Sequence, residues 1–328
     1  METSNKPTRR QVITAGAAAC GLATLGATGL AQLPSGTRRV ERPGAPLRFA
    51  HLTDTHVQPE RRAGEGFAAA LQSLSRLDPP PSFIITGGDH VMDVFETDGK
   101  RADVQWELYN QVLRANTKLP VYPCMGNHDV WGWGASPDKV APDAAGYGKA
   151  QAVERLGMKG PYYSFDEGPW HFICLDNIVR RNREYFGGLD EAQAKWLADD
   201  LAASKGKPVC VVSHIPLLAA CVFFDGDDRV REDFWHVPDS YMHRDVKPLL
   251  DLFRRAGDVR LLLSGHIHLV DRVDYLGMTF VCDGAVCGGW WKGPNQEFPE
   301  GYGVIDLWPD GTFEHRYATY GWDAKGQP

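Results

Sequence analysis

The stretch LLLSGHIH, residues 261–268, places two histidines directly after a run of apolar residues. The leucine run is typical of a buried strand, and the glycine that follows marks its end. In an extended chain alternate side chains point to the same side, so His266 and His268 are predicted to reach one site. Imidazole is a common metal ligand, and the stretch therefore raises the question of which other ligands share that site.

Four other apolar runs, at 47–52, 82–86, 120–125 and 208–213, also end in polar groups. They are followed by TDTH, GGD, GNHD and a lone histidine. Ligands bind at the carboxyl ends of strands in α/β sheets, so the five loops are predicted to converge. Together they carry seven good ligands for a divalent metal: Asp54, His56, Asp89, Asn127, His214, His266 and His268. Seven ligands exceed the needs of one ion with open positions and suit two ions that share a carboxylate.

The order of the predicted elements indicates an α/β fold. Helical spacing at 64–77, 102–116, 189–204 and 246–257 alternates with the strand-like runs, to which 171–176 and 259–265 also belong. After residue 268 the chain changes to strands joined by turns, which are predicted to complete a second sheet packed on the first. Nothing within 47–328 has the composition of a linker, so this range is predicted to be one domain.

Composition argues against partners that attract a protein through a large charged surface. The net charge is −7 and the body has no basic run, so no nucleic-acid polymer or anionic lipid surface is expected to bind it. The seven cysteines form no CxxC pair, which argues against a zinc knuckle or a thioredoxin-type motif. Cys282 and Cys287 could bridge in an oxidising compartment, and the sequence leaves that open, as it does the oligomeric state.

Residues 1–31 have the features of an export signal peptide. Arg9 and Arg10 precede an uncharged Ala- and Gly-rich stretch that ends in the small-x-small pattern at 29–31, and residues 8–13 resemble a twin-arginine signal. Residues 32–46, rich in Pro, Gly and Arg, are predicted to be a linker. An uncleaved membrane anchor is the alternative, although four glycines dilute the hydrophobicity. The sequence thus predicts an exported, periplasmic or extracytoplasmic protein that meets the membrane only through its signal.

The motifs DxH, GGD, GNHD, a lone His and GHxH, in this order over residues 54–268, resemble those of the calcineurin-like metallophosphoesterases, including the class III cyclic nucleotide phosphodiesterase-like branch. The resemblance implies a four-layer α/β/β/α sandwich of two mixed sheets with a dimetal site at the strand C-terminal ends. It implies that one metal is held by Asp54, His56, Asp89 and His268, and that Asp89 bridges to a second held by Asn127, His214 and His266. His128 would be a general acid oriented by Asp129. Met92 stands where purple acid phosphatases carry a tyrosine ligand, so an Fe(III)–tyrosinate site is not expected.

The resemblance also implies the chemistry. The protein would be a dimetal-dependent phosphoesterase that hydrolyses small phosphomonoesters or phosphodiesters by metal-hydroxide attack, with His128 protonating the leaving group. The metals would be two divalent or mixed-valence transition ions, with Mn, Fe and Zn as options. Two alternatives stay open: a 3',5'-cyclic-nucleotide phosphodiesterase, and a non-catalytic metal-binding scaffold, which predicts gaps among the ligands. A monoesterase needs extra cations, for which Arg180, Arg181 and Arg183 are candidates.

Aromatic residues surround several of these motifs. Trp131 and Trp133 follow GNHD, Trp290 and Trp291 lie in a Gly-rich loop, and the long segment 219–244 has the length of a lid. These rings either bind a flat organic group of the substrate or pack the insert onto the domain. His90 and Asp93 are either supports of the metal site or exposed loop residues. His51 is expected in the core, and His236, His243 and His315 at the surface.

Overall fold

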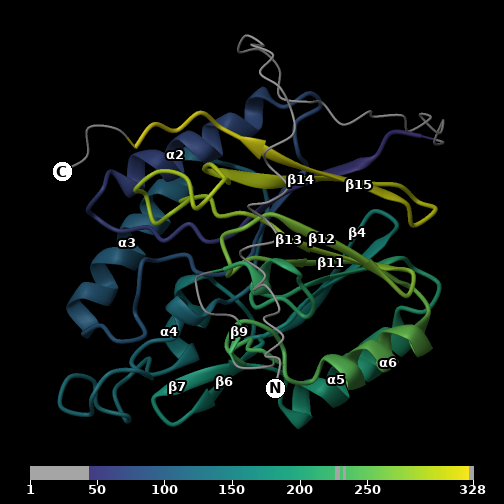
Figure 1. Cartoon of the computed structure of the whole chain (residues 1–328). Coiled ribbons are helices and arrows are strands. Elements are labelled where there is room, and N and C mark those ends of the chain that lie inside the picture. Colours follow the sequence, from purple (N-terminus) through teal and green to yellow (C-terminus); the bar gives the residue numbers. More distant parts are fainter. Residues whose placement is uncertain (1–43, 226–229, 232–233, 325–328) are drawn as a thin grey trace, which may run out of the picture. The chain divides into compact units, whose positions relative to one another are not determined.

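The computed structural model describes residues 44–225, 230–231 and 234–324, and these belong to one compact unit (Figure 1). The predicted signal peptide and nearly all of the predicted linker lie outside the described residues, so both stay predictions. Within the described residues, no helix is both long enough and apolar enough to span a bilayer.

Two mixed β-sheets form the centre of this unit. In the first sheet β1, β2 and β3 are parallel, and β14 and β15 continue it antiparallel to β1. Their bounds are β1 Leu47–Leu52, β2 Phe83–Thr86, β3 Val121–Pro123, β14 Gly301–Leu307 and β15 Phe313–Thr319. In the second sheet β13, β11, β8 and β5 are parallel, with β12 and β4 antiparallel at the edges. Their bounds are β12 Asp271–Tyr275, β13 Met278–Cys282, β11 Val259–Ser264, β8 Val209–Val212, β5 Trp170–Cys174 and β4 Tyr163–Glu167.

Helices cover the outer face of each sheet, as Figure 1 shows. α2 (Ala63–Ser73) and α3 (Gly99–Asn116) pack on the first sheet, and α5 (Glu191–Ala203) and α6 (Val246–Ala256) on the second. Phe49 and Phe83 of the first sheet meet Phe172 of the second in an apolar layer between the sheets. The predicted α/β/β/α sandwich is therefore confirmed.

The helix ends follow from local sequence. Asp98 and Asp190 are N-caps whose side chains accept hydrogen bonds from the backbone N–H groups of Arg101 and Gln193. Gly257 ends α6 in the left-handed conformation, with φ of 80°.

The strands after residue 268 differ from the prediction. They do not complete one second sheet: β12 and β13 extend the sheet that contains β11, while β14 and β15 return to the sheet that contains β1. β14 is buried along its whole length because it lies between β1 and β15.

Several short elements were not predicted and lie in the connections. They are the helix α4 (Lys149–Arg155), the hairpins β6 (Ile178–Arg181) with β7 (Glu184–Gly187) and β9 (Val230–Arg231) with β10 (Phe234–Trp235), and the 3-10 turns at Leu74–Arg76, Asn127–Asp129 and Cys221–Phe223.

Candidate metal centre

The structure brings all seven predicted ligands together at the carboxyl ends of β1, β2, β3, β8 and β11. Their backbone is not extended, contrary to the expectation for DxH and HxH. Five of the seven have a left-handed backbone, with φ between 39° and 71°: Asp54, His56, Asp89, His266 and His268. A left-handed residue other than glycine costs roughly 1–2 kcal/mol. Backbone strain is thus concentrated at this site.

Each of the two buried carboxylates has one oxygen fixed by the protein. Asp54 Oδ2 accepts hydrogen bonds from Thr53 Oγ1 at 2.6 Å and from the His266 backbone N–H at 2.9 Å. Asp89 Oδ1 accepts one from the His128 backbone N–H at 2.8 Å. The other oxygens, Asp54 Oδ1 and Asp89 Oδ2, face the histidines.

Gly265 makes the first of these arrangements possible. A Cβ at this position would lie 2.0 Å from Thr53 Oγ1 and 2.3 Å from Asp54 Oδ2. The glycine of GHIH is therefore required by close approach rather than by its own backbone angle.

Each histidine of the cluster is oriented by a backbone carbonyl. One ring nitrogen of each lies near a carbonyl oxygen: His214 Nδ1 near Gly87 at 2.9 Å, His268 Nδ1 near Gly288 at 2.8 Å, His266 Nε2 near Ser240 at 2.9 Å, and His56 Nδ1 near Met92 at 3.3 Å. A carbonyl only accepts, so that nitrogen must carry the proton. In the neutral ring the other nitrogen is then an acceptor that points into the centre, as in metal-binding histidines.

The first group of inward atoms comes from DxH and the second histidine of GHIH. His56 Nε2 and His268 Nε2 are 3.1 Å apart, and His268 Nε2 lies 3.3 Å from Asp54 Oδ1. Asp89 Oδ2 lies 3.6 Å from His56 Nε2.

The second group surrounds His214 Nε2. It lies 3.1 Å from Asp89 Oδ2, 3.1 Å from Asn127 Oδ1 and 3.2 Å from His266 Nδ1. Asp89 Oδ2 thus faces both groups, which is the position of a bridging ligand.

The inward atoms fit metal ions better than they fit each other. Once the outer nitrogens are protonated, the facing nitrogens and oxygens are all acceptors, so no proton lies between them. Asp54 Oδ1 is buried and has no hydrogen-bond partner. A buried carboxylate oxygen without a partner is costly unless a cation compensates it. Imidazole nitrogens with carboxylate and amide oxygens are a donor set for borderline transition metals. The residues present therefore fit two such ions.

Electrostatics within the centre favour the ionised carboxylates. Burial raises the pKa of Asp54, but the charges of His268 and His214 outweigh it, so the pKa lies well below its usual value. Burial lowers the pKa of His214, yet Asp89 and Asp54 raise it to about 9, so its inward nitrogen also holds a proton at neutral pH, which a bound metal would displace. Burial dominates at His56 and lowers its pKa to about 3. The centre thus holds two carboxylates that stay negative and attract cations.

His128 lies beside the centre, with one ring nitrogen within 4.8 Å of ligand atoms of His56 and Asp89. Its Nδ1 is 3.5 Å from Asp93 Oδ1, and both side chains are 31% exposed. Burial lowers the pKa of His128, but Asp89 and Asp93 outweigh this effect and raise it. Asp93 is thus the carboxylate that supports His128.

The prediction that Asp129 orients His128 does not match this geometry. Asp129 is fully buried and accepts hydrogen bonds from the backbone N–H groups of Gly126 and His90. Its Oδ2 also bonds His90 Nδ1, while His90 Nε2 reaches Thr86 Oγ1. Asp129 and His90 therefore connect the loop that carries Asp89 to the loop that carries Asn127 by hydrogen bonds.

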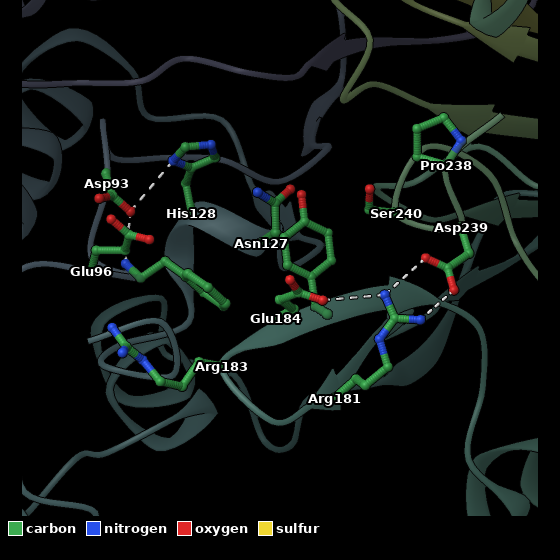
Figure 2. A pocket seen from close by; sticks show the side chains of 12 residues that line it. Asp93, Glu96, Asn127, His128, Arg181, Arg183, Glu184, Pro238, Asp239 and Ser240 are labelled. Carbon is green, nitrogen blue, oxygen red and sulfur yellow. Dashed lines mark hydrogen bonds and ion pairs between the residues drawn. The ribbon is translucent and has the colours of Figure 1, made fainter. Parts of the chain in front are cut away.

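Two cavities meet at His128. The metal cavity, of about 180 Å³, is lined by five of the seven ligands, all but Asp54 and His214, and a larger cleft, of about 540 Å³, opens beside it. Both are lined by Asn127, His128 and Tyr185. Figure 2 shows His128 and Asn127 at the cleft, together with Arg181 in its ion pair with Asp239.

Of the four tryptophans near the site, one lines the metal cavity and three pack against other parts of the domain. Trp290 lines the metal cavity, with its ring centroid 4.7 Å from that of His268. Trp291 is completely buried and donates to the Thr55 and His56 carbonyls. Trp131 is buried too, and the Trp133 ring packs against the cations of Lys149 and Arg180. Only Trp290 of these four rings faces the metal cavity among its described lining residues.

Other side chains depart from their predicted places. His243 is buried and bonds Asn177 and Asp245, and His315 bonds the buried Asp283, which also bonds the core residue His51. Both His243 and His315 were predicted at the surface. Their carboxylate partners, the partly exposed Asp245 and the buried Asp283, explain their positions, and His236 is partly exposed. Cys282 and Cys287 are free thiols, and Cys287 lies beside His56 and His268.

Two contributors to the site were not predicted. Ser240, within the insert 219–244, orients His266 through its carbonyl, and Tyr185 lies on the β6–β7 hairpin. Neither belongs to a motif, and their positions depend on how long connections fold back over the sheet ends.

Comparison with known proteins gives a consistent result. Residues 47–270 match the family model described as calcineurin-like phosphoesterase. The chain is 26% identical over 280 residues to a 3',5'-cyclic-nucleotide phosphodiesterase of Nostoc sp., over 82% of this chain and 90% of that protein. It is 28% identical over 227 residues to the human serine/threonine-protein phosphatase CPPED1, over 66% of this chain and 63% of that protein. Among solved structures, a dimetal phosphatase from Danio rerio superposes with a TM-score of 0.58 at 14% identity, over 84% of this chain and 97% of that one.

Proposed function

The chain belongs to the calcineurin-like phosphoesterase family and is a metal-dependent phosphoric ester hydrolase, and we propose that it acts on small phosphate diesters, including 3',5'-cyclic nucleotides. A relative that aligns over 90% of its own length is named a 3',5'-cyclic-nucleotide phosphodiesterase. The observation that carries the proposal, however, is the charge around the site.

The metal cavity has no lysine or arginine among its described lining residues. The neighbouring cleft has two arginines, and both are engaged. Arg181 binds Asp239 through two nitrogens, and Arg183 donates twice to the Gly134 carbonyl. A phosphomonoester carries up to two negative charges and a diester carries one. Among the described lining residues the metal cavity itself thus has no cation besides bound metals, which matches the single charge of a diester better than the double charge of a monoester.

In this proposal His128 is the general acid. Bound metal ions would supply positive charge and lower the pKa of a water nucleophile. His128 lies where the two cavities join, so a phosphate in the metal cavity places its leaving group in the cleft, within reach of the imidazole. The raised pKa keeps a proton on His128, which it can give to the departing oxygen, worth about 10²–10⁴-fold in rate.

The substrate proposal is tested with metal-loaded protein and three probes: bis(4-nitrophenyl) phosphate, 4-nitrophenyl phosphate and 3',5'-cyclic AMP. We expect kcat/KM to be higher for the two diesters than for the monoester. A clear preference for 4-nitrophenyl phosphate would contradict the proposal and favour a phosphatase.

The role of His128 is tested by His128→Ala, with His236→Ala as a control outside the site. The His128 variant should keep both metals and lose turnover by about 10²–10⁴-fold, most of all for alkoxide leaving groups. Loss of a metal in this variant would mean that His128 is a ligand instead.

The identity of the metals is part of the proposal. The nitrogen and oxygen donors suit Mn, Fe or Zn as two divalent or mixed-valence ions. Elemental analysis of loaded protein should find two ions per chain, and fewer in Asp89→Ala, since Asp89 faces both groups. One ion per chain, unchanged in the variant, would contradict a shared centre.

We also propose that residues 1–31 export the protein in a folded state. The twin-arginine-like residues Arg9 and Arg10 in the sequence support this proposal. Replacing both by lysine should leave the protein in the cytoplasm, as fractionation would detect. Unimpaired export would indicate another route or a membrane anchor.

A further inference from the structure

Tyr185 occupies the boundary between the metal cavity and the cleft. It lies on β7, and its ring centroid is 5.6 Å from that of Phe95 in the cleft and 6.4 Å from that of His266 in the metal centre. Among the described lining residues, it shares both cavities with Asn127 and His128 alone. Asn127 Oδ1 faces His214 in the metal centre and His128 is the proposed general acid, so a phosphate bound between the two would lie beside Tyr185.

The phenol offers a neutral hydrogen-bond donor at this place. Its hydroxyl makes no hydrogen bond to another residue that the structure describes, and the side chain is only partly buried, so the group is open to a ligand in the cavity. Burial, with the negative charge of Asp89, raises the pKa of Tyr185 well above its ordinary value. The group therefore carries its proton at any working pH and can only be useful to a ligand as a donor or through its ring.

We propose that the Tyr185 hydroxyl is a catalytic donor that binds a non-bridging oxygen of the diester phosphate. The inference rests on the proposed function, since it places the phosphate between the metal centre and His128. In phosphoryl transfer, charge is spread over the equatorial oxygens, and a fixed donor aimed at one of them stabilises the transition state.

The reaction balances without proton transfer from the tyrosine. A water oxygen forms the new bond to phosphorus and loses one proton, and the bond to the leaving oxygen breaks. His128 gives its proton to that oxygen and is later reprotonated by the proton from water. Tyr185 keeps its proton throughout and only shortens its hydrogen bond as charge develops.

A neutral donor at this place also agrees with a site that binds the single negative charge of a diester. A guanidinium here would match the dianion of a monoester, whereas a phenol adds a hydrogen bond without a charge. Tyr241 also lines the metal cavity. It is not among the described residues that line the cleft, so it would contact only the part of a diester that lies in the metal cavity.

The test is Tyr185→Phe, which removes one oxygen and keeps the ring against Phe95. Tyr147→Phe is the matched control, because its hydroxyl bonds Arg180 and lines neither cavity. With bis(4-nitrophenyl) phosphate we expect kcat to fall roughly 10- to 100-fold in Tyr185→Phe, with KM changed less than about threefold. Metal content and Tm should equal those of the wild type, and Tyr147→Phe should keep its kcat.

A kcat within about twofold of wild type would overturn the inference, as would a change in KM alone. Failure of the proposed function gives a different result. If the wild-type enzyme hydrolyses 4-nitrophenyl phosphate and not the diester, the substrate proposal fails. Tyr185→Phe is then measured on the monoester: loss of kcat would still support the donor, and an unchanged kcat would refute it.

Discussion

Trp290 and Trp291 are neighbours with similar backbone angles, φ 55° and 65°, and the structure predicts opposite effects for their removal. Trp291 is fully buried, its ring stacks edge-on with Trp322, and a Cβ at Gly66 would come within 2.2 Å of it. Trp291→Ala leaves a large cavity and removes the donor of two hydrogen bonds to the backbone at Thr55 and His56. Deleting a buried tryptophan side chain costs roughly 3–5 kcal/mol.

Trp290 is 38% exposed, so Trp290→Ala exposes little new apolar surface. Its ring lies over His268 at the wall of the metal cavity. If it stacks on the base of a cyclic nucleotide, its loss removes about 1–3 kcal/mol of binding. KM for 3',5'-cyclic AMP should then rise about tenfold, and KM for dimethyl phosphate should stay nearly the same.

Differential scanning calorimetry and steady-state kinetics on both variants separate the two roles. Trp291→Ala should lower Tm by roughly 6–10 °C, since each kcal/mol shifts Tm by about 2 °C or more in a domain of this size. Trp290→Ala should leave Tm within about 2 °C of the wild type. Equal loss of stability in both variants, or equal KM changes for both substrates in Trp290→Ala, would refute the assignment.

Three further outcomes follow from contacts away from these rings. Asp200 and Asp166 outweigh the effect of burial and raise the pKa of His171. Its stabilising effect is therefore complete below the unfolded-state pKa of about 6.5 and is lost as pH rises through the higher folded-state value. In urea titrations the stability difference between wild type and His171→Gln should shrink as the pH is raised above about 6.5. Gly265→Ala should weaken metal binding about 10- to 100-fold by competition titration, whereas Gly160→Ala, with no atom nearer than 3.8 Å to its Cβ, should bind as the wild type does. Asp93→Asn should lower kcat about tenfold for poor leaving groups while Glu96→Gln, in the same cleft, should not; equal effects would mean that the cleft responds to charge in general.

The sequence predicted that the seven candidate ligands converge, because the signal for their positions is local. Each ligand follows an apolar strand directly, so its place in space is fixed once the strands align in a sheet. His214 shows this most simply: it has no motif of its own, and only the strand before it predicts its position. The helices and central strands were predicted for a similar reason. The spacing of apolar residues along the sequence indicates whether one face of an element is buried or both.

The parts that the sequence did not predict depend on long-range contacts. Asp93 and Asp129 are both acidic loop residues near His128, and only the fold decides which one reaches the imidazole. Ser240 contributes a backbone carbonyl, which any residue has, so its identity carries no signal. Strands β14 and β15 return to the first sheet across a long loop, and strand-like periodicity does not specify the partner of a strand.

The left-handed backbone of the ligands shows how local sequence and long-range contacts together position these side chains. In an extended chain the two members of each pair, two residues apart, point to the same side but lie roughly 6–7 Å apart along the strand. At Asp54, His56, His266 and His268 a left-handed turn of the backbone brings both members of each pair to the centre. The cost of this conformation is offset by contacts from other loops: the His56 N–H donates to the Asp89 carbonyl, and the His266 N–H donates to the Asp54 carboxylate. Each ligand loop is thus held by hydrogen bonds from another loop, so the strain at these positions is offset by the fold around them.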